Sequence, residues 1–283
     1  LIRADLTTSV PVSRIAPSTM GFLGRYLRGI GKPPQTDSTF TMSFNLEIRD
    51  HELLNEVLLP EKAGIRLEKL QGNVNEQEDL VRLDIRVPEI RFGALSANGI
   101  EIQLDAEGKT LNGHMTLADI QRKDLVVSDI RLEAVTKEER IDLVFEIPGK
   151  DTVNLKILGD LRWTEGEPVL SLDREGLFLN GKAWEVDNAN RIVLSDPLKI
   201  SHFNLSSGRQ AIRLDQEPGS DTDSRTRLEI DHFKLGNLGS LPATDTLLVE
   251  GLMQARLLFD PQKAIPEAKL NIDSLTYKGY RLG

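Results

Sequence analysis

LKISHFNL at residues 198–205 and LEIDHFKL at residues 228–235 share one pattern, thirty positions apart. Each reads apolar-x-apolar-x-x-apolar-x-apolar, so two alternating segments are joined by one extra residue, His202 or His232. Alternation of this kind is typical of a β-strand with one apolar and one polar face. The extra residue breaks the alternation, and the repetition of that break suggests a structural purpose.

A β-bulge at the extra residue would keep both halves of the segment on one face of a sheet. In the first copy it would return Phe203 and Leu205 to the face of Leu198 and Ile200. Because bulges also bend a sheet, repeated bulges would curl a long antiparallel sheet with its apolar face inside. Ordinary sandwich strands with irregular ends are the alternative, and the pattern alone leaves both open.

Looser copies of the octapeptide occur along the chain. They are IRLEKLQG from Ile65, LSANGIEI from Leu95, LVVSDIRL from Leu125 and LNIDSLTY from Leu270. This recurrence suggests a repeated strand–loop–strand unit.

Strict alternation without an extra residue appears in three further segments. Their apolar positions are Phe40, Met42, Phe44, Leu46 and Ile48; Val81, Leu83, Ile85 and Val87; and Ile141, Leu143, Phe145 and Ile147. Helical periodicity is scarce, with possible short helices near residues 20–30 and 50–60. We therefore predict one continuous β-rich repeat segment over residues 1–283, with about 14 strands.

Composition narrows the classes of function. The chain has 283 residues and a formal net charge of -9, which argues against nucleic acid as a partner. It has no cysteine, so disulfides and thiolate metal sites are excluded. No window approaches the roughly 20 apolar residues of a membrane span. Because the chain begins with Leu1, we interpret it as a piece of a longer protein.

No catalytic or metal-binding pattern emerges from the polar residues. His51 lacks the second histidine of an HExxH zinc helix. His202 and His232 occupy equivalent positions, but outward-facing bulge residues explain them better than a pair of ligands. Asp221 and Asp223 lack the other ligands of a calcium loop. We predict no catalytic residue, no metal, no cofactor and no enzymatic activity.

The one-sided apolar stripes need a cover, because each buried Leu, Ile or Phe contributes roughly 1.5–3 kcal/mol. Either two sheets close on each other, or one sheet folds into a trough that an apolar ligand can occupy.

Three stretches resemble the TamB family (translocation and assembly module), especially its Bacteroidetes-type members. They are GLFLNGKAWEVDNANRIVLSDPLKISHFNLSSGRQAIRLDQ from Gly176, the segment from LEIDHFKL to the terminal YKGYRLG, and LEIRDHELLNEVLLPEKAGIRLEKLQGNV from Leu46. The resemblance covers roughly residues 45–283. It rests on repeats rather than on an invariant chemical motif.

The resemblance implies a U-shaped antiparallel sheet, or β-taco, with an aliphatic interior, as in AsmA-like and bridge-like lipid transfer proteins. It implies a periplasmic location, with inner-membrane anchoring by segments outside this chain. The implied partners are phospholipid acyl chains and an Omp85-type, TamA-like outer-membrane protein. The implied function is phospholipid transport between the two membranes, with support of outer-membrane protein assembly and secretion.

We predict that the groove is lined by the apolar positions of the repeats and strands. They are Leu198, Ile200, Phe203, Leu205, Leu228, Ile230, Phe233, Leu235, Leu270, Ile272, Val81, Leu83, Ile85, Val87, Ile141, Leu143 and Phe145. The alternative is a scaffolding β protein that assists outer-membrane protein assembly by strand-edge pairing without carrying lipid. A conduit demands an uninterrupted apolar stripe, whereas edge pairing demands only a long free edge.

Overall fold

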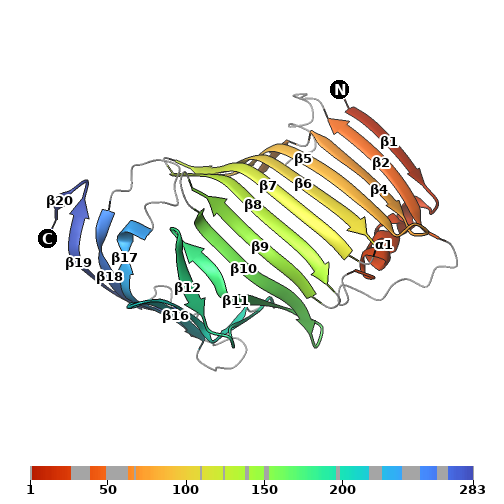
Figure 1. Cartoon of the computed structure of the whole chain (residues 1–283). Coiled ribbons are helices and arrows are strands. Elements are labelled where there is room, and N and C mark those ends of the chain that lie inside the picture. The colour runs from red at the N-terminus through yellow and green to blue at the C-terminus, as the bar shows by residue number, and fades with distance from the viewer. Residues whose placement is uncertain are drawn as a thin grey trace. The chain divides into compact units, whose positions relative to one another are not determined.

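The computed structural model shows a chain built almost entirely of antiparallel strands (Figure 1). It divides into two compact units, Leu1–Val144 and Phe145–Gly283. The structure describes residues 2–26, 39–48, 63–66, 68–108, 110–123, 125–137, 140–149, 153–195, 198–216, 225–237, 249–259 and 267–282.

In its described residues the first unit holds a single open sheet and one helix. Its elements are β1 (Ile2–Thr8), α1 (Val12–Leu23), β2 (Thr41–Ile48), β3 (Ala63–Arg66), β4 (Lys69–Asn75), β5 (Leu80–Phe92), β6 (Leu95–Glu107), β7 (Thr110–Arg122) and β8 (Leu125–Lys137). Antiparallel pairing runs in the order β1–β2–β4–β5–β6–β7–β8, with β3 beside the far end of β5. Strand β9 (Arg140–Pro148) spans the boundary between the units.

The second unit is also antiparallel, with shorter strands. Its elements are β10 (Val153–Thr164), β11 (Glu167–Leu179), β12 (Lys182–Val186), β13 (Arg191–Val193), β14 (Lys199–Ser201), β15 (Phe203–Ser207), β16 (Gln210–Gln216), β17 (Thr226–Lys234), the 3-10 helix η1 (Leu235–Asn237), β18 (Val249–Phe259), β19 (Glu267–Tyr277) and β20 (Tyr280–Arg281). Strand β11 pairs with β10, β12 and β13, and β13 pairs with β14. From β12 the pairing continues in the order β15–β16–β17–β18–β19–β20.

The predicted all-β class with an open antiparallel sheet is confirmed. The described residues form twenty strands rather than about 14, because several alternating segments are interrupted. Strand β3 ends at Arg66 and β4 begins at Lys69, and a loop at 187–190 separates β12 from β13. His202 separates β14 from β15.

The helix lies earlier in the chain than the sequence predicts. It begins at Val12 and ends at Leu23, so it shares only residues 20–23 with the predicted helix near 20–30. Its inner face carries Ile15, Phe22 and Leu23, which pack against the sheet. Tertiary contact, rather than helical propensity, therefore sets its position. The helix predicted near 50–60 lies outside the described residues.

The predicted bulge is present in the copy that begins at Leu228. On β17 the step from Ile230 to Phe233 covers three residues, whereas on β18 the paired step from Ala255 to Met253 covers two. Ala255 and Met253 share a face, so Ile230 and Phe233 do too. His232 is exposed, with a φ of 47°.

The copy that begins at Leu270 has the same device. Glu250 pairs with Thr276 and Leu252 pairs with Asp273, which leaves one extra residue on β19. Ser274, the fifth residue of this copy, has a φ of 56°. His202 holds the same position in the copy from Leu198, with a φ of 52°, and is likewise exposed.

The copies in β6 and β8 behave differently. Their fifth residues, Gly99 and Asp129, have φ values of 63° and 58°, but no residue is inserted relative to the neighbouring strands. Instead, pairing is interrupted along a line through Pro88, Gly99, Ala118 and Asp129. The expected bulge is absent here because the neighbouring strands β5 and β7 break their own alternation of apolar residues opposite Gly99 and Asp129. No strand therefore has an extra residue relative to its neighbour.

Substitution of His232 tests the importance of the left-handed backbone. His232→Val should lower the free energy of unfolding by about 1–2 kcal/mol, since a β-branched residue is strained at positive φ. His232→Gly should be neutral or slightly stabilising. Urea unfolding of both variants measures the difference, and equal stabilities would contradict the role of the bulge.

Strands β10 and β11 approach each other closely at Gly159, so two Gly→Ala substitutions should differ in their effect on stability. A Cβ on Gly159 would lie 2.4 Å from the Ser171 carbonyl oxygen, whereas on Gly113 its nearest neighbour, a Leu104 methyl group, would be 3.5 Å away. Gly159→Ala should therefore reduce the free energy of unfolding by about 1–3 kcal/mol, while Gly113→Ala is tolerated. The same urea measurement distinguishes them, and a stable Gly159→Ala variant would refute the close approach.

Candidate apolar binding face

Apolar side chains of the first unit form a row across its sheet, one from each of six paired strands. Its members, paired in succession from β2 to β8, are Leu46, Leu70, Ile85, Ile102, Met115 and Leu132. All of these side chains are only half-buried. At a strand spacing of about 4.8 Å the row is roughly 24 Å long. We call it the central row.

A second row runs beside the central row. Its members are Phe44, Gly72, Leu83, Leu104, Gly113 and Ala134. Half of them are small, and the Phe44 ring occupies the space that a Cβ on Gly72 would need, 2.4 Å away. Neither row contains a charged or hydrogen-bonding side chain. The two rows therefore form one continuous apolar surface.

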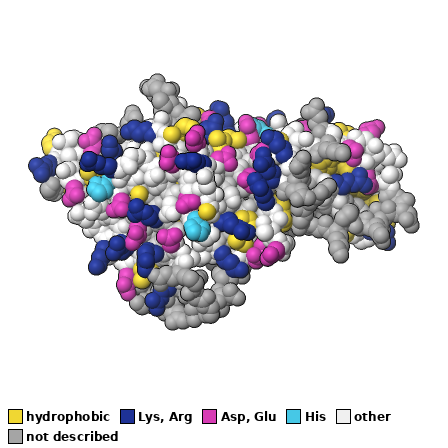
Figure 2. All heavy atoms as spheres, turned by 60° about the horizontal axis from the view of Figure 1, so that its bottom comes forward, with side chains coloured by type: hydrophobic (Ala, Val, Ile, Leu, Met, Phe, Trp, Pro, Cys, Tyr) yellow, Lys and Arg dark blue, Asp and Glu magenta, His cyan; other side chains and the backbone are white. Residues whose placement is uncertain are grey.

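The residues between these positions make the opposite face polar. Ion pairs join neighbouring strands there, including Lys69 Nζ to Asp84 Oδ2 at 2.9 Å and Arg82 Nε to Asp105 Oδ1 at 3.1 Å. Figure 2 shows basic and acidic side chains interspersed on the face that it presents. The polar face is satisfied by water and by ion pairs, so only the apolar face needs a cover.

Helix α1 covers one margin of the apolar face. Phe22 and Tyr26, 3% and 6% exposed, pack with Phe40, Val74 and Val81 in one buried cluster. The Phe22 and Tyr26 rings meet edge to face, with centroids 5.7 Å apart. Within the described part of the first unit, no other helix lies over the sheet. The central row is therefore left half-exposed.

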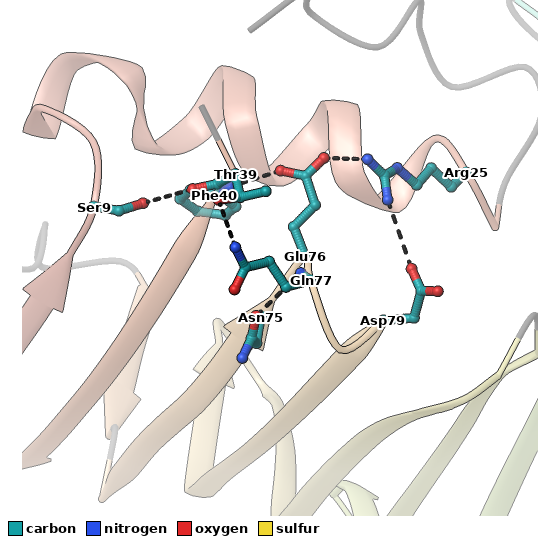
Figure 3. Close-up of polar contacts among 8 residues, drawn as sticks. All are labelled: Ser9, Arg25, Thr39, Phe40, Asn75, Glu76, Gln77 and Asp79. Atoms are coloured by element: carbon teal, nitrogen blue, oxygen red, sulfur yellow. Dashed lines mark hydrogen bonds and ion pairs between the residues drawn. The ribbon is translucent and has the colours of Figure 1, made fainter. Parts of the chain in front are cut away.

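A polar network fixes the chain after α1 to the turn between β4 and β5 (Figure 3). Glu76 accepts hydrogen bonds from the Phe40 N–H at 2.6 Å and from Arg25, which also lies 3.6 Å from Asp79. Tyr26 Oη donates to the Asp79 carbonyl oxygen at 3.0 Å. Burial, aided by the nearby Asp79 charge, raises the pKa of Tyr26 above its usual range. The network holds the helix at the margin.

The second unit has comparable rows. One consists of Val186, Leu205, Ile212, Ile230, Ala255 and Leu270, paired from β12 to β19. Another consists of Phe203, Leu214, Leu228, Leu257 and Ala268. Charged residues are again absent from these rows.

The second unit fills part of its apolar face with its own side chains. Trp184 and Phe233 are 1% and 3% exposed, and their ring centroids are 6.0 Å apart. They belong to β12 and β17, which are three strand intervals apart, or about 14 Å along a flat sheet. The sheet therefore curls around this cluster, which also contains Val186 and Leu205. Farther along, Leu270 is 64% exposed.

Five of the eleven predicted lining residues of the second unit fall in these rows. Leu205, Ile230 and Leu270 belong to the first row, and Phe203 and Leu228 to the second. Leu205 and Phe233 are buried in the packed cluster and do not face an open surface.

The other predicted lining residues of the second unit lie apart from these two rows. Phe233 and Ile272 both pair with Met253, whereas Ile200 pairs with Ile192 on β13. Leu198 is 44% exposed, Leu235 is buried in η1, and Phe145 is half-buried in β9.

In the first unit, Leu83 and Ile85 lie in the two rows, and Val81 and Val87 are buried beside them. Ile141 and Leu143 are half-buried in β9.

Sequence reasoning missed Ile102, Met115 and Leu132 as lining residues. Ile102 and Leu132 end two of the octapeptide copies, so a signal for them was present. Met115 could be placed only by the register between strands.

The described residues contain neither a metal-ligand cluster nor a membrane-spanning helix. No group of three or more His, Asp or Glu side chains is arranged to hold a metal ion. None of the helices in the same residues is long and apolar enough to cross a bilayer.

The difference in burial between the units predicts a difference in thiol reactivity. The chain has no cysteine, so Ile102→Cys and Val186→Cys each introduce a single thiol. Maleimide should label Cys at 102 quickly, because that position is half-exposed. It should label Cys at 186 slowly, because Val186 is 3% exposed and burial raises a thiol pKa. Similar rates in the folded proteins would contradict the assignment, and Gln103→Cys supplies the fully accessible reference.

Comparisons with protein-family models, curated proteins and solved structures found no match to the chain. The resemblance to the TamB family therefore stays a prediction.

Proposed function

We propose that the chain is a non-enzymatic periplasmic bridge segment whose apolar face carries phospholipid acyl chains between the inner and outer membranes. The observation that carries the proposal is the unbroken central row, which crosses six strands without a charge. A conduit requires such continuity, because a single charge in an apolar path opposes the passage of hydrocarbon.

The dimensions of the central row suit an acyl chain. Two acyl chains end to end span the roughly 30 Å hydrocarbon core of a bilayer, so one spans about 15 Å. The central row is roughly 24 Å long and can accommodate one extended chain. The neighbouring row adds width, since Gly72, Gly113 and Ala134 project little above the sheet.

The chemistry of the face suits movement rather than tight binding. Aliphatic contacts are individually weak and have no preferred direction, so a chain can shift along them without breaking hydrogen bonds. Half-buried side chains such as Ile85 and Met115 gain by being covered with hydrocarbon. In the proposed state the phospholipid head groups stay in water beyond the margins of the sheet.

The remaining parts of the proposal come from the family resemblance. They are the periplasmic location, anchoring by segments outside this chain, an Omp85-type, TamA-like partner and support of outer-membrane protein assembly.

Scaffolding by strand-edge pairing is the second candidate function, and the edge strand β19 favours it. Within the described residues, β20 pairs with β19 only at Thr276 and Tyr277. Apart from the Leu275 carbonyl, which accepts a hydrogen bond from the Leu282 N–H at 2.9 Å, the described part of that edge is therefore available to another strand. The central row nevertheless favours the conduit, because edge pairing does not need an uninterrupted apolar face.

Charges placed in the central row test the lipid proposal. Ile102→Glu combined with Met115→Glu should abolish most lipid binding, because two carboxylates interrupt the apolar path. The matched control is Gln103→Glu with Thr116→Glu, which adds the same charges one residue along each strand on the opposite face. Solvent extraction and mass spectrometry of the purified proteins measure bound phospholipid.

The outcomes separate the two candidate functions. Lipid in the wild type and the control, but not in the row variant, supports the conduit. Equal lipid in all three folded proteins refutes the central row as its site, and a wild type without lipid favours the scaffold. Circular dichroism confirms that each variant is folded.

A further inference from the structure

We propose that the turns joining β5 to β6 and β7 to β8 form a docking surface for an anionic lipid bilayer. The inference concerns the margin of the first unit rather than its apolar rows, and it does not depend on acyl-chain transport.

Two leucines lie exposed beside these turns. Leu95 begins β6 and Leu125 begins β8, with 41% and 45% of their surfaces exposed. Arg122 at the end of β7 pairs with both of them. Directly paired residues share a face, so the three side chains form a row of leucine, arginine and leucine. The two turns are therefore adjacent and present one combined surface.

The turns are basic in a chain that is acidic overall. Arg91, Arg122 and Lys123 stand at these strand ends. Arg91 is paired with Glu89 at 2.5 Å, so the positive charge of the surface comes from Arg122 and Lys123, beside one acidic residue of the sequence, Asp124. Arg122 and Lys123 are exposed, and no ion pair to either occurs within the described residues. The balance contrasts with the formal net charge of -9 for the whole chain.

One turn at the opposite end of the same sheet has the reverse charge. The turn between β4 and β5 carries Glu76, Glu78 and Asp79 without a basic residue of its own. Among the described residues, Arg25 from the chain after α1 is the one basic residue that pairs with it. An anionic surface would therefore attract the end with Arg122 and Lys123 and repel the other.

Exposed leucines between basic residues fit a membrane interface better than water. Leucine side chains gain by entering the boundary between head groups and acyl chains, and basic side chains gain near anionic phosphates. Arg122 lies between Leu95 and Leu125, so both contributions act at one place. A purely charged patch would attract any anion, but the leucines add a preference for hydrocarbon.

The test is co-sedimentation of the whole chain with lipid vesicles. Vesicles of phosphatidylcholine with phosphatidylglycerol should bind the protein, vesicles of phosphatidylcholine alone should bind it weakly, and added salt should release it. Arg122→Glu with Lys123→Glu should reduce partitioning at least about tenfold, given the attraction of each basic residue to an anionic surface. Leu95→Ser with Leu125→Ser should also weaken it.

A matched control carries the same change in net charge elsewhere. Arg14→Glu with Arg131→Glu replaces two exposed arginines of the first unit away from the turns and should leave binding close to wild type. If this control and the turn variant lose binding equally, the surface is not specific and the proposal is wrong. Absence of wild-type binding to the anionic vesicles would also overturn it.

Insertion of the leucines into the bilayer can be measured separately. The chain lacks cysteine, so one introduced thiol carries a dye at a single position. An environment-sensitive dye on Leu125→Cys should shift to the blue with anionic vesicles, whereas the same dye on Glu133→Cys, farther along β8, should not. A shift at neither site would mean that the leucines stay in water and would overturn insertion. Binding to soluble polyanions with equal strength would favour an acidic protein partner instead.

Discussion

The cross-strand pairing of apolar residues on one face is the constraint on which the rest of the structure depends. Aliphatic residues alternate with polar ones over much of each long strand, and the register aligns those of the central row without a charge. Because alternate side chains face opposite sides, a shift of one residue would bring aliphatic and charged positions together on each face. The ion pairs of the polar face, such as Lys69–Asp84, support the same register.

The two units cover their apolar faces in different ways. In the second, the sheet curls until Trp184 contacts Phe233, so the chain covers part of its own apolar surface. In the first, α1 packs over one margin, and the middle of the face stays half-exposed. The left-handed residues His232 and Ser274 allow such changes of direction, because their bulges interrupt regular extension and keep the apolar side chains on one face.

The fold class and the special position within the octapeptide could be predicted from the sequence. His202, His232 and Ser274 have positive φ values at the position where the pattern shows an extra residue. The prediction was incomplete at Gly99 and Asp129, because the presence of a bulge depends on the neighbouring strands. The site residues were harder to predict. Leu205 and Phe233 share the pattern of open lining residues but are buried, since burial depends on how far the sheet curls.

The sequence by itself determined the strands, their apolar and polar faces and the repeated break in alternation, because period two and backbone preference are local properties. Only the tertiary structure decided which aliphatic residues meet in a row and which are covered. It also decided that α1 begins at Val12 and that Arg122 lies between two exposed leucines. These features require residues that are far apart in the chain to approach one another, and their register is set by all the strands together.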